Sequence, residues 1–232
     1  MILLLETATL NCSVALARPD GTLVGRQDEH AEKHQHAERL HVLIDTLLHT
    51  HNVAKGDLTA VAVGNGPGSF TGLRIGTSAA KGMCAGLGLP LVAPSPLKAL
   101  QHLGTQHMPS LAETPERIVP AIDARRMEIY TLGADGHPAA TVVDEGFRTD
   151  LQGGPALLIG DGATKCQDVL EGATAEWTCI DAFPTAADLL PEALTLLAEG
   201  QTVDVADHEP HYLKDFVPGR PKDPLGLRTP NA

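Results

Sequence analysis

The residue types with the clearest chemical potential in this chain of 232 residues lie in a glycine-rich loop, Asn65-Gly-Pro-Gly-Ser-Phe-Thr-Gly-Leu-Arg-Ile-Gly76. Glycines allow backbone amides to turn inward, and the first turn of a helix can hold an anion. Ser69 or Thr71 can cap a helix that starts here. The loop has neither the lysine nor the spacing of a P-loop, and it is not G-x-G-x-x-G. It therefore indicates either an anion contact or a tight turn from strand to helix.

A cluster of histidines is the second feature that suggests chemistry. Six of the 11 histidines lie between residues 30 and 51, and His30 and His34 are four positions apart. On a helix, that spacing would place two imidazoles on one face, as in a metal-binding pair. No third ligand is indicated nearby, and a solvated start of a helix explains the cluster as well. We therefore predict no metal site.

Charged residues gather at an expected turn in the second half, in Asp123-Ala-Arg125-Arg126-Met-Glu128. They indicate contact with a ligand or partner, or only a local cluster of ion pairs. Ile159-Gly-Asp-Gly162 lies between an expected strand and an expected helix, and a lone G-x-G is a weak sign of nucleotide binding. No Ser-His-Asp or Cys-His order stands out, so no catalytic residue is predicted.

The elements that position these residues follow from the spacing of apolar side chains. Short apolar runs predict strands, and leucines and Ile44 recur at helical spacing from residue 40 to residue 48. The first part predicts strands at 2–8, 12–18, 22–27, 60–64 and 89–93 and helices at 35–51, 71–88 and 94–103. This order indicates a mixed sheet, antiparallel at its start, with helices packed on it.

The second part of the chain repeats the opening of the first. The apolar run Ile2 to Glu6 ends in a carboxylate and precedes a turn at Asp20-Gly21, and Val119 to Asp123 precedes Asp135-Gly136 in the same way. The pattern continues with strands near 127–132, 139–147 and 156–160 and helices near 163–171 and 185–199. The polar stretch 104–116 marks a boundary. We expect domains at 1–103 and 104–210 and a partly loose tail at 211–232.

Composition excludes several classes of protein. The chain has 17 basic and 29 acidic side chains, a net charge of −12, and the first 100 residues are neutral, so residues 101–232 hold the whole excess. Such a chain is a poor nucleic-acid binder on its own. A hydrophobic content of 43% argues against disorder. Without a signal peptide, an apolar span or paired cysteines, we expect a cytoplasmic chain with free thiols and no membrane contact.

The expected helix at 71–88 is rich in small residues. Gly72, Gly76 and Ala80 are four positions apart, as are Gly82 and Gly86. A glycine inside a helix costs about 1 kcal/mol relative to alanine, so something must offset it. Close approach of another backbone is such an offset, either within the domain or in a partner. The helices at 35–51 and 71–88 are both short of charge, which favours a helical interface between subunits.

The sequence resembles the TsaB (YeaZ) family along nearly its whole length. The matching residues are Leu5-Glu-Thr-Ala-Thr9, the loop Gly66–Gly76, Ile122-Asp-Ala-Arg125 with Glu128 and Tyr130, and Glu209-Pro210 with Tyr212-Leu213. His36 is similar to a recurrent histidine of the family at the start of the first long helix. Glu6 stands where many members have aspartate, so the carboxylate is retained.

This resemblance implies an α/β fold of two duplicated actin-like (ASKHA, RNase H-like) lobes, with mixed sheets flanked by helices. It also implies a non-catalytic scaffold subunit of the complex that transfers a threonylcarbamoyl group to N6 of adenosine in tRNA. The implied partners are a TsaD-like transferase and a TsaE-like ATPase, with tRNA reached only through the complex. A homodimer through the same helices, when no partner is present, stays open against a monomer. No intrinsic cofactor is implied, and ATP or ADP at a complex interface stays open.

The resemblance places the partner interface on the two N-terminal helices, at His36, Leu40, Leu43, Leu47, Gly72, Leu73, Ile75, Gly76, Ala79 and Ala80. On that basis Gly72→Leu or Gly76→Leu should abolish pairing and leave the monomer folded. Contacts to a nucleotide or anion are assigned to Thr7, Gly66, Gly68, Ser69, Asp123 and Arg125.

One departure bears on catalysis. TsaD-like proteins carry H-x-x-x-H after the small-residue helix and its following strand, and those histidines hold the metal. Here that place reads Pro94-Ser-Pro-Leu-Lys-Ala99, without histidine. We therefore expect no metal and no activity of the chain alone. The alternative is an autonomous ATP- or metal-dependent enzyme of the same fold, either a phosphotransferase or a glycoprotease-like protein.

Overall fold

The computed structural model describes residues 1–30, 35–108, 117–150, 155–170 and 177–214. The first part of the chain builds a five-stranded sheet of order β3-β2-β1-β4-β5. Its strands are β1 (Ile2–Glu6), β2 (Asn11–Ala17), β3 (Leu23–His30), β4 (Ala60–Val63) and β5 (Leu91–Val92). The pairs β1–β2 and β2–β3 are antiparallel, whereas β4 pairs in parallel with β1 and β5 with β4. The mixed sheet predicted from the sequence is confirmed.

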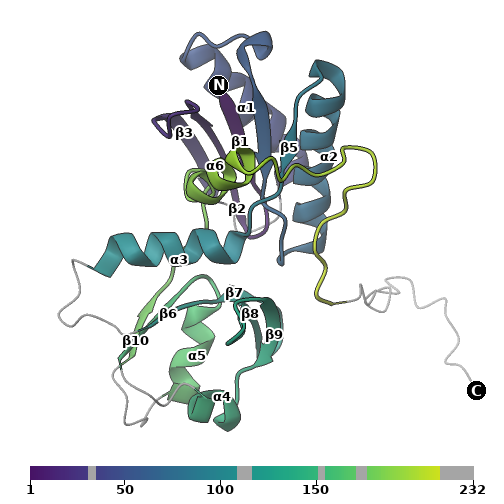
Figure 1. Ribbon diagram of the computed structural model, residues 1–232. Coiled ribbons are helices and arrows are strands. Elements are labelled where there is room, and N and C mark those ends of the chain that lie inside the picture. The colour runs from purple at the N-terminus through teal and green to yellow at the C-terminus, as the bar shows by residue number, and fades with distance from the viewer. Residues whose placement is uncertain (31–34, 109–116, 151–154, 171–176, 215–232) are drawn as a thin grey trace, which may run out of the picture.

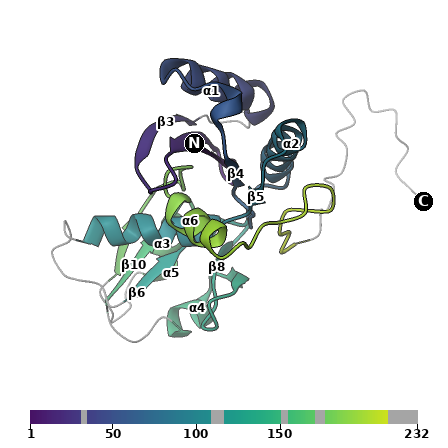
Figure 2. The same ribbon diagram turned by 45° about the horizontal axis from the view of Figure 1, so that its top comes forward.

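Helices cover both faces of this sheet (Figures 1 and 2). One face packs against α1 (His36–Thr50) and α2 (Phe70–Leu87), and the other against α6 (Leu190–Ala198) and the start of α3 (Pro96–His107). All five residues of β1 are buried. Side chains alternate between the two faces of a strand, so Leu3 and Leu5 pack under α1 and α2 and Ile2 and Leu4 pack toward α6.

The second part of the chain repeats this topology. Its two three-stranded sheets have the orders β11-β10-β6 and β7-β8-β9. The strands are β6 (Arg117–Pro120), β7 (Ile122–Asp123), β8 (Glu128–Leu132), β9 (Pro138–Val142), β10 (Ala156–Ile159) and β11 (Trp177–Ile180), accompanied by α4 (Glu145–Asp150) and α5 (Ala163–Leu170). Only Ala121 separates β6 from β7. Taken together as one strand, they give the order β9-β8-β7/β6-β10-β11, which matches the first sheet and confirms the predicted duplication.

Several elements differ from the sequence predictions. The strand expected at 139–147 ends at Val142, because the Asp144 carboxylate accepts hydrogen bonds from the amides of Gly146 and Phe147 and turns the chain into α4. The helix expected from 185 begins at Leu190, after a turn in which Thr185 N donates to Asp188 Oδ2. The sequence predicted no strand at β11.

Helix α3 extends beyond its predicted end. It runs to His107 rather than to residue 103, so the expected domain boundary falls inside a helix that packs against β6 and β10. Helix α6 returns in the other direction and packs on the first sheet. The division into domains stays a prediction. No helix in the described residues is long and apolar enough to cross a bilayer.

Candidate functional site

The glycine-rich loop holds the turn between β1 and β2 beneath the start of α2. Ser69 caps the helix by accepting a hydrogen bond from Gly72 N, and the Ser69 amide donates to the Ala8 carbonyl at 2.7 Å. A Cβ at Gly72 would lie less than 3.0 Å from the carbonyl oxygen of Thr7, and one at Gly76 equally close to the Thr7 hydroxyl. These two glycines are therefore required for packing within the chain.

His36 fixes the same turn from the other helix. Its side chain is 2% exposed, and its Nε2–H donates a 2.8 Å hydrogen bond to the Thr9 carbonyl. Burial lowers the pKa of His36 below its usual range, although the bond to Thr9 opposes the shift. The imidazole is therefore a neutral structural donor between α1 and the β1–β2 turn.

Most residues predicted for the partner interface lie inside the single chain. Nine of the ten are buried against the sheet or the β1–β2 turn, namely His36, Leu40, Leu43, Leu47, Gly72, Leu73, Gly76, Ala79 and Ala80, and Ile75 is partly exposed. The expectation that Gly72→Leu or Gly76→Leu leaves the monomer folded is wrong, because either side chain would collide with Thr7. The apolar stripe of both helices is core.

The outward face of the same helix pair carries an open groove of about 1060 Å³. Two of the predicted interface residues, Ile75 and Ala79, line it, and most of its other walls are small or apolar side chains. These include Ile44, Ser78, Gly82, Met83, Gly86 and Leu87, whereas His41, Asp45, Lys55 and Arg74 add polar and charged groups. A Cβ at Gly82 or Gly86 would meet nothing within 4 Å. These glycines therefore face open space, unlike Gly72 and Gly76.

A second cavity of about 640 Å³ lies between the two halves of the molecule. The β1–β2 turn and the start of α2 form one wall, and the β7–β8 turn and residues 211–214 form the other. Four of the residues assigned to nucleotide or anion contact line it, namely Gly68, Ser69, Asp123 and Arg125. Thr7 and Gly66 are buried and do not line it.

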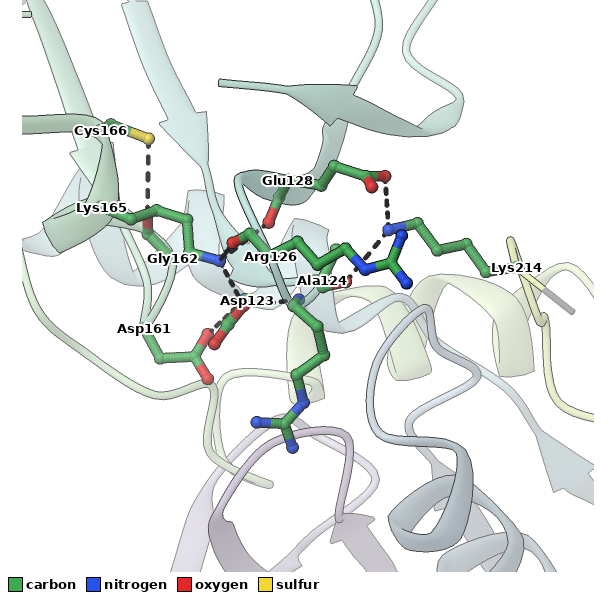
Figure 3. A network of polar contacts seen from close by, with 10 residues as sticks. Asp123, Ala124, Arg126, Glu128, Asp161, Gly162, Lys165, Cys166 and Lys214 are labelled. Carbon is green, nitrogen blue, oxygen red and sulfur yellow. Dashed lines mark hydrogen bonds and ion pairs between the residues drawn. The ribbon is translucent and has the colours of Figure 1, made fainter. Parts of the chain in front are cut away.

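Two ion pairs fix the β7–β8 side of this cavity (Figure 3). Lys165 Nζ lies 2.5 Å from Asp123 Oδ1 and donates to the carbonyls of Arg126 and Glu128. Lys214 Nζ lies 2.5 Å from Glu128 Oε2 and donates to the Ala124 carbonyl. Each lysine neutralises one carboxylate, so Asp123 and Glu128 do belong to a local cluster of ion pairs, as one of the two interpretations of the turn had it.

Two arginines of the turn are held differently. Arg125 and Arg126 have φ values of 67° and 51°, a conformation that non-glycine residues rarely adopt. Asp123 Oδ1 accepts from the Arg125 amide and stabilises this geometry. Both side chains are exposed, and no ion pair of either guanidinium occurs in the described ranges. On the same side of the cavity, Asp161 Oδ1 accepts a 2.9 Å hydrogen bond from the Asp123 amide, and burial raises the pKa of Asp161 to about 6.

The chain is similar to known proteins along nearly its whole length. A family model described as "TsaD: tRNA N6-adenosine threonylcarbamoyltransferase" matches residues 28–144. The chain is 32% identical to the tRNA threonylcarbamoyladenosine biosynthesis protein TsaB of Escherichia coli (strain K12), over 93% of this chain and 95% of that protein. The chain belongs to the TsaB family. The corresponding protein of Haemophilus influenzae is 29% identical over 94% of this chain and 98% of its own length.

A solved member of the TsaB family has the same fold. The structure of YeaZ from Pseudomonas aeruginosa aligns with a TM-score of 0.74 and 29% identity, over 91% of this chain and 99% of that chain. The resemblance drawn from the sequence is confirmed, as is the α/β fold of two related halves with mixed sheets and flanking helices.

The TsaB-family motif at the end of β1 contains a carboxyl group that is sealed from solvent. Glu6 is 0% exposed, and its Oε1 accepts a 2.5 Å hydrogen bond from the Ala8 amide. Burial, the largest of the causes, raises the pKa of Glu6 to about 8. The side chain therefore keeps its proton at neutral pH and does not act as an anionic ligand.

The histidine pair of this TsaB-family chain is only partly described. His30 ends β3 and its ring lies 4.4 Å from that of Phe183, whereas His34 falls outside the described residues. Within the described residues there is no group of three His, Cys, Asp or Glu side chains that could hold a metal ion.

Sequence patterns did not identify the surface that α1 and α2 expose to solvent. Gly82, Gly86 and Met83 line the groove but were not assigned to it. The four-residue spacing of Gly82 and Gly86 was visible, yet it looks the same as the spacing of Gly72 and Gly76. Only the side of α2 on which each pair lies distinguishes the two.

Proposed function

We propose that this chain is a non-catalytic scaffold subunit that pairs with a TsaD-like threonylcarbamoyltransferase and activates it in tRNA modification. The observation that carries the proposal is the open α1–α2 groove, with glycines that face no neighbour in the chain. Relatives that match nearly the full length are named as tRNA threonylcarbamoyladenosine biosynthesis proteins.

The composition of the groove suits a helical partner. Gly82 and Gly86 lie one turn apart in α2, where each costs about 1 kcal/mol of helix stability relative to alanine. At Gly72 and Gly76 the chain itself offsets this cost, because Thr7 packs closely in the space beside them. A partner helix that packs closely over Gly82 and Gly86 would supply the same offset there.

Residues 94–99 support a structural role where TsaD-like proteins place histidines. Ser95 precedes α3, and its amide donates a 2.7 Å hydrogen bond to Glu192 Oε2. Lys98 Nζ lies 2.7 Å from Glu192 Oε1. These contacts join α3 to α6, and we propose that the chain has no transferase activity alone.

Further partners follow from the same proposal. The net charge of −12 favours contact with tRNA through the complex rather than through this chain alone. A TsaE-like ATPase completes the proposed assembly. When the transferase is absent, the groove would form the interface of a homodimer.

The cavity lined by Gly68, Ser69, Asp123 and Arg125 is the proposed contact for a nucleotide or anion. We place the complex in the cytoplasm, where tRNA is modified.

Reconstitution tests the proposal. Threonylcarbamoylated tRNA is measured with this chain alone, with a TsaD-like transferase alone, and with both, each in the presence of the TsaE-like ATPase and substrates. We expect product only when both proteins are present. Product formed by this chain without the transferase would favour the autonomous enzyme, and full activity of the transferase alone would remove the scaffold role.

A further inference from the structure

We propose that a pocket between α2 and residues 208–212 binds a phosphate group. The pocket has a volume of about 510 Å³, and its polar lining residues include Arg74, Thr77, Ser78, Lys81, His208 and Glu209. It shares Phe70 and Tyr212 with the cavity between the two halves, whereas Arg74, Lys81 and His208 line this pocket and not that cavity. The proposal goes beyond the pairing with a transferase.

Two polar side-chain atoms in this pocket have no partner. Thr77 is 4% exposed, and neither its hydroxyl nor the buried Nε2 of His208 makes a hydrogen bond within the described structure. An unsatisfied buried polar group destabilises the folded state. Thr77 and His208 both line this pocket, so a ligand that bonded to both of these buried atoms would satisfy them at once.

The pocket is built before any ligand arrives. Lys81 Nζ donates hydrogen bonds of 2.9 Å to the carbonyls of Ala206 and His208, and the His211 amide donates to the Asn65 carbonyl at 2.7 Å. The Phe70 and Tyr212 rings pack with centroids 4.8 Å apart. The last part of the described chain therefore lies fixed along α2 (Figures 1 and 2).

The donors in the pocket select an anionic ligand. Arg74 contributes a guanidinium, and Lys81 has a third N–H beyond the two that its carbonyl partners use. Thr77 and Ser78 supply hydroxyl donors. Glu209 is the one carboxylate among the lining residues, so two cations face a single anion. The oxygens of an ionised phosphate group carry negative charge and accept hydrogen bonds, which matches this set.

His208 fits the same assignment. Burial and the nearby Lys81 ammonium lower its pKa below the usual range for histidine, so the ring is neutral near pH 7. A neutral ring with its proton on Nε2 donates to a phosphate oxygen without adding charge. The proposed ligand class is inorganic phosphate or the phosphate of a nucleotide.

A titration of the full chain with inorganic phosphate, in a phosphate-free buffer, tests the proposal. Binding is measured by calorimetry and by the NMR signal of the His208 ring, with the His102 ring of α3 as reference. We expect a saturable shift of the His208 signal alone. ADP should bind at the same site and adenosine should not, which shows that the phosphate is recognised.

Matched variants locate the site. Thr77→Val and Arg74→Gln should each weaken phosphate binding about tenfold or more, because each removes a hydrogen bond to a charged ligand. Thr77→Ser keeps the hydroxyl and should retain binding, which separates loss of the donor from loss of the fold. Arg18→Gln removes an exposed cation just after β2 that lines neither this pocket nor the cavity between the two halves, and it should leave the affinity unchanged.

The proposal is overturned by any of four results. These are the absence of a saturable response, unchanged affinity of folded Thr77→Val, loss of binding in Arg18→Gln, and adenosine binding as tightly as ADP. The absence of a response would show that only water satisfies Thr77 and His208.

Discussion

The Nε2–H of His36 donates a 2.8 Å hydrogen bond to the main-chain carbonyl of Thr9, and both residues are buried. This bond ties the first residue of α1 to the turn between β1 and β2. The same turn packs against α2, where Thr7 fills the space beside Gly72 and Gly76. One short turn therefore sets the positions of both helices, and with them the shape of the groove on their outer side.

The first prediction concerns His36 and pH. Burial lowers the pKa of His36 in the folded state, so the unfolded chain takes up the proton first as pH falls. The stability contribution is present above the usual histidine pKa, about 6.5, and is lost below it. His36→Gln keeps a donor for Thr9 but does not titrate. We expect its free energy of unfolding to fall less between pH 7.5 and 5.5 in urea titrations.

The control for this prediction is on the same helix. His41 is exposed, and His41→Gln should show the same pH dependence as the unsubstituted chain. Equal slopes for His36→Gln and the unsubstituted chain would contradict the assignment of His36 as a buried neutral donor.

The second prediction concerns two glycines of α2, whose replacement by alanine should change the free energy of unfolding in opposite directions. Gly72→Ala places a Cβ against the Thr7 carbonyl and should destabilise the fold by about 1–3 kcal/mol, as overpacking does. Gly82→Ala meets no neighbour and should stabilise the helix by up to about 1 kcal/mol. Urea unfolding of both variants measures the difference, and equal effects would contradict the two roles.

The sequence predicted the fold where apolar spacing was strong. The strands around Leu3 and Val61 and both long helices were found within a few residues, and the repeat from Val119 to Asp123 was recognised. The ends of elements were missed where local hydrogen bonds decide them. The carboxylate of Asp144 starts α4, and nothing in the apolar pattern indicates that contact.

The candidate site was less predictable for a different reason. Periodicity identifies the apolar face of a helix, and that face becomes core, as Leu40 and Leu47 show. A partner surface must instead be read from what remains exposed. The predicted Gly68, Ser69, Asp123 and Arg125 do meet in one cavity, because the duplicated topology brings two turns together. The Thr77–His208 pocket joins residues distant in sequence, which no local pattern reveals.

The third prediction concerns the buried carboxyl of Glu6. Burial raises its pKa from 4.5 to about 8, so the folded state keeps a proton that the unfolded state has lost. The stability contribution of this group therefore decreases as pH rises from about 4.5 to 8. Glu6→Gln should lose less stability across this window in urea titrations. Glu38→Gln, an exposed carboxylate on α1, is the control and should leave the slope unchanged.

The fourth prediction tests the groove as the surface for a partner. Gly82 is exposed and has open space above it, so Gly82→Glu should leave the monomer folded. A carboxylate in the groove would lose its hydration when a helix packs over it, and an unpaired buried charge is strongly unfavourable. We expect affinity for the TsaD-like transferase to fall at least about 100-fold, with a matching loss of reconstituted activity. Thr195→Glu, exposed on α6 across the sheet, adds the same charge and should leave pairing intact. If Gly82→Glu bound and activated the transferase as the unsubstituted chain does, the partner would have to bind elsewhere.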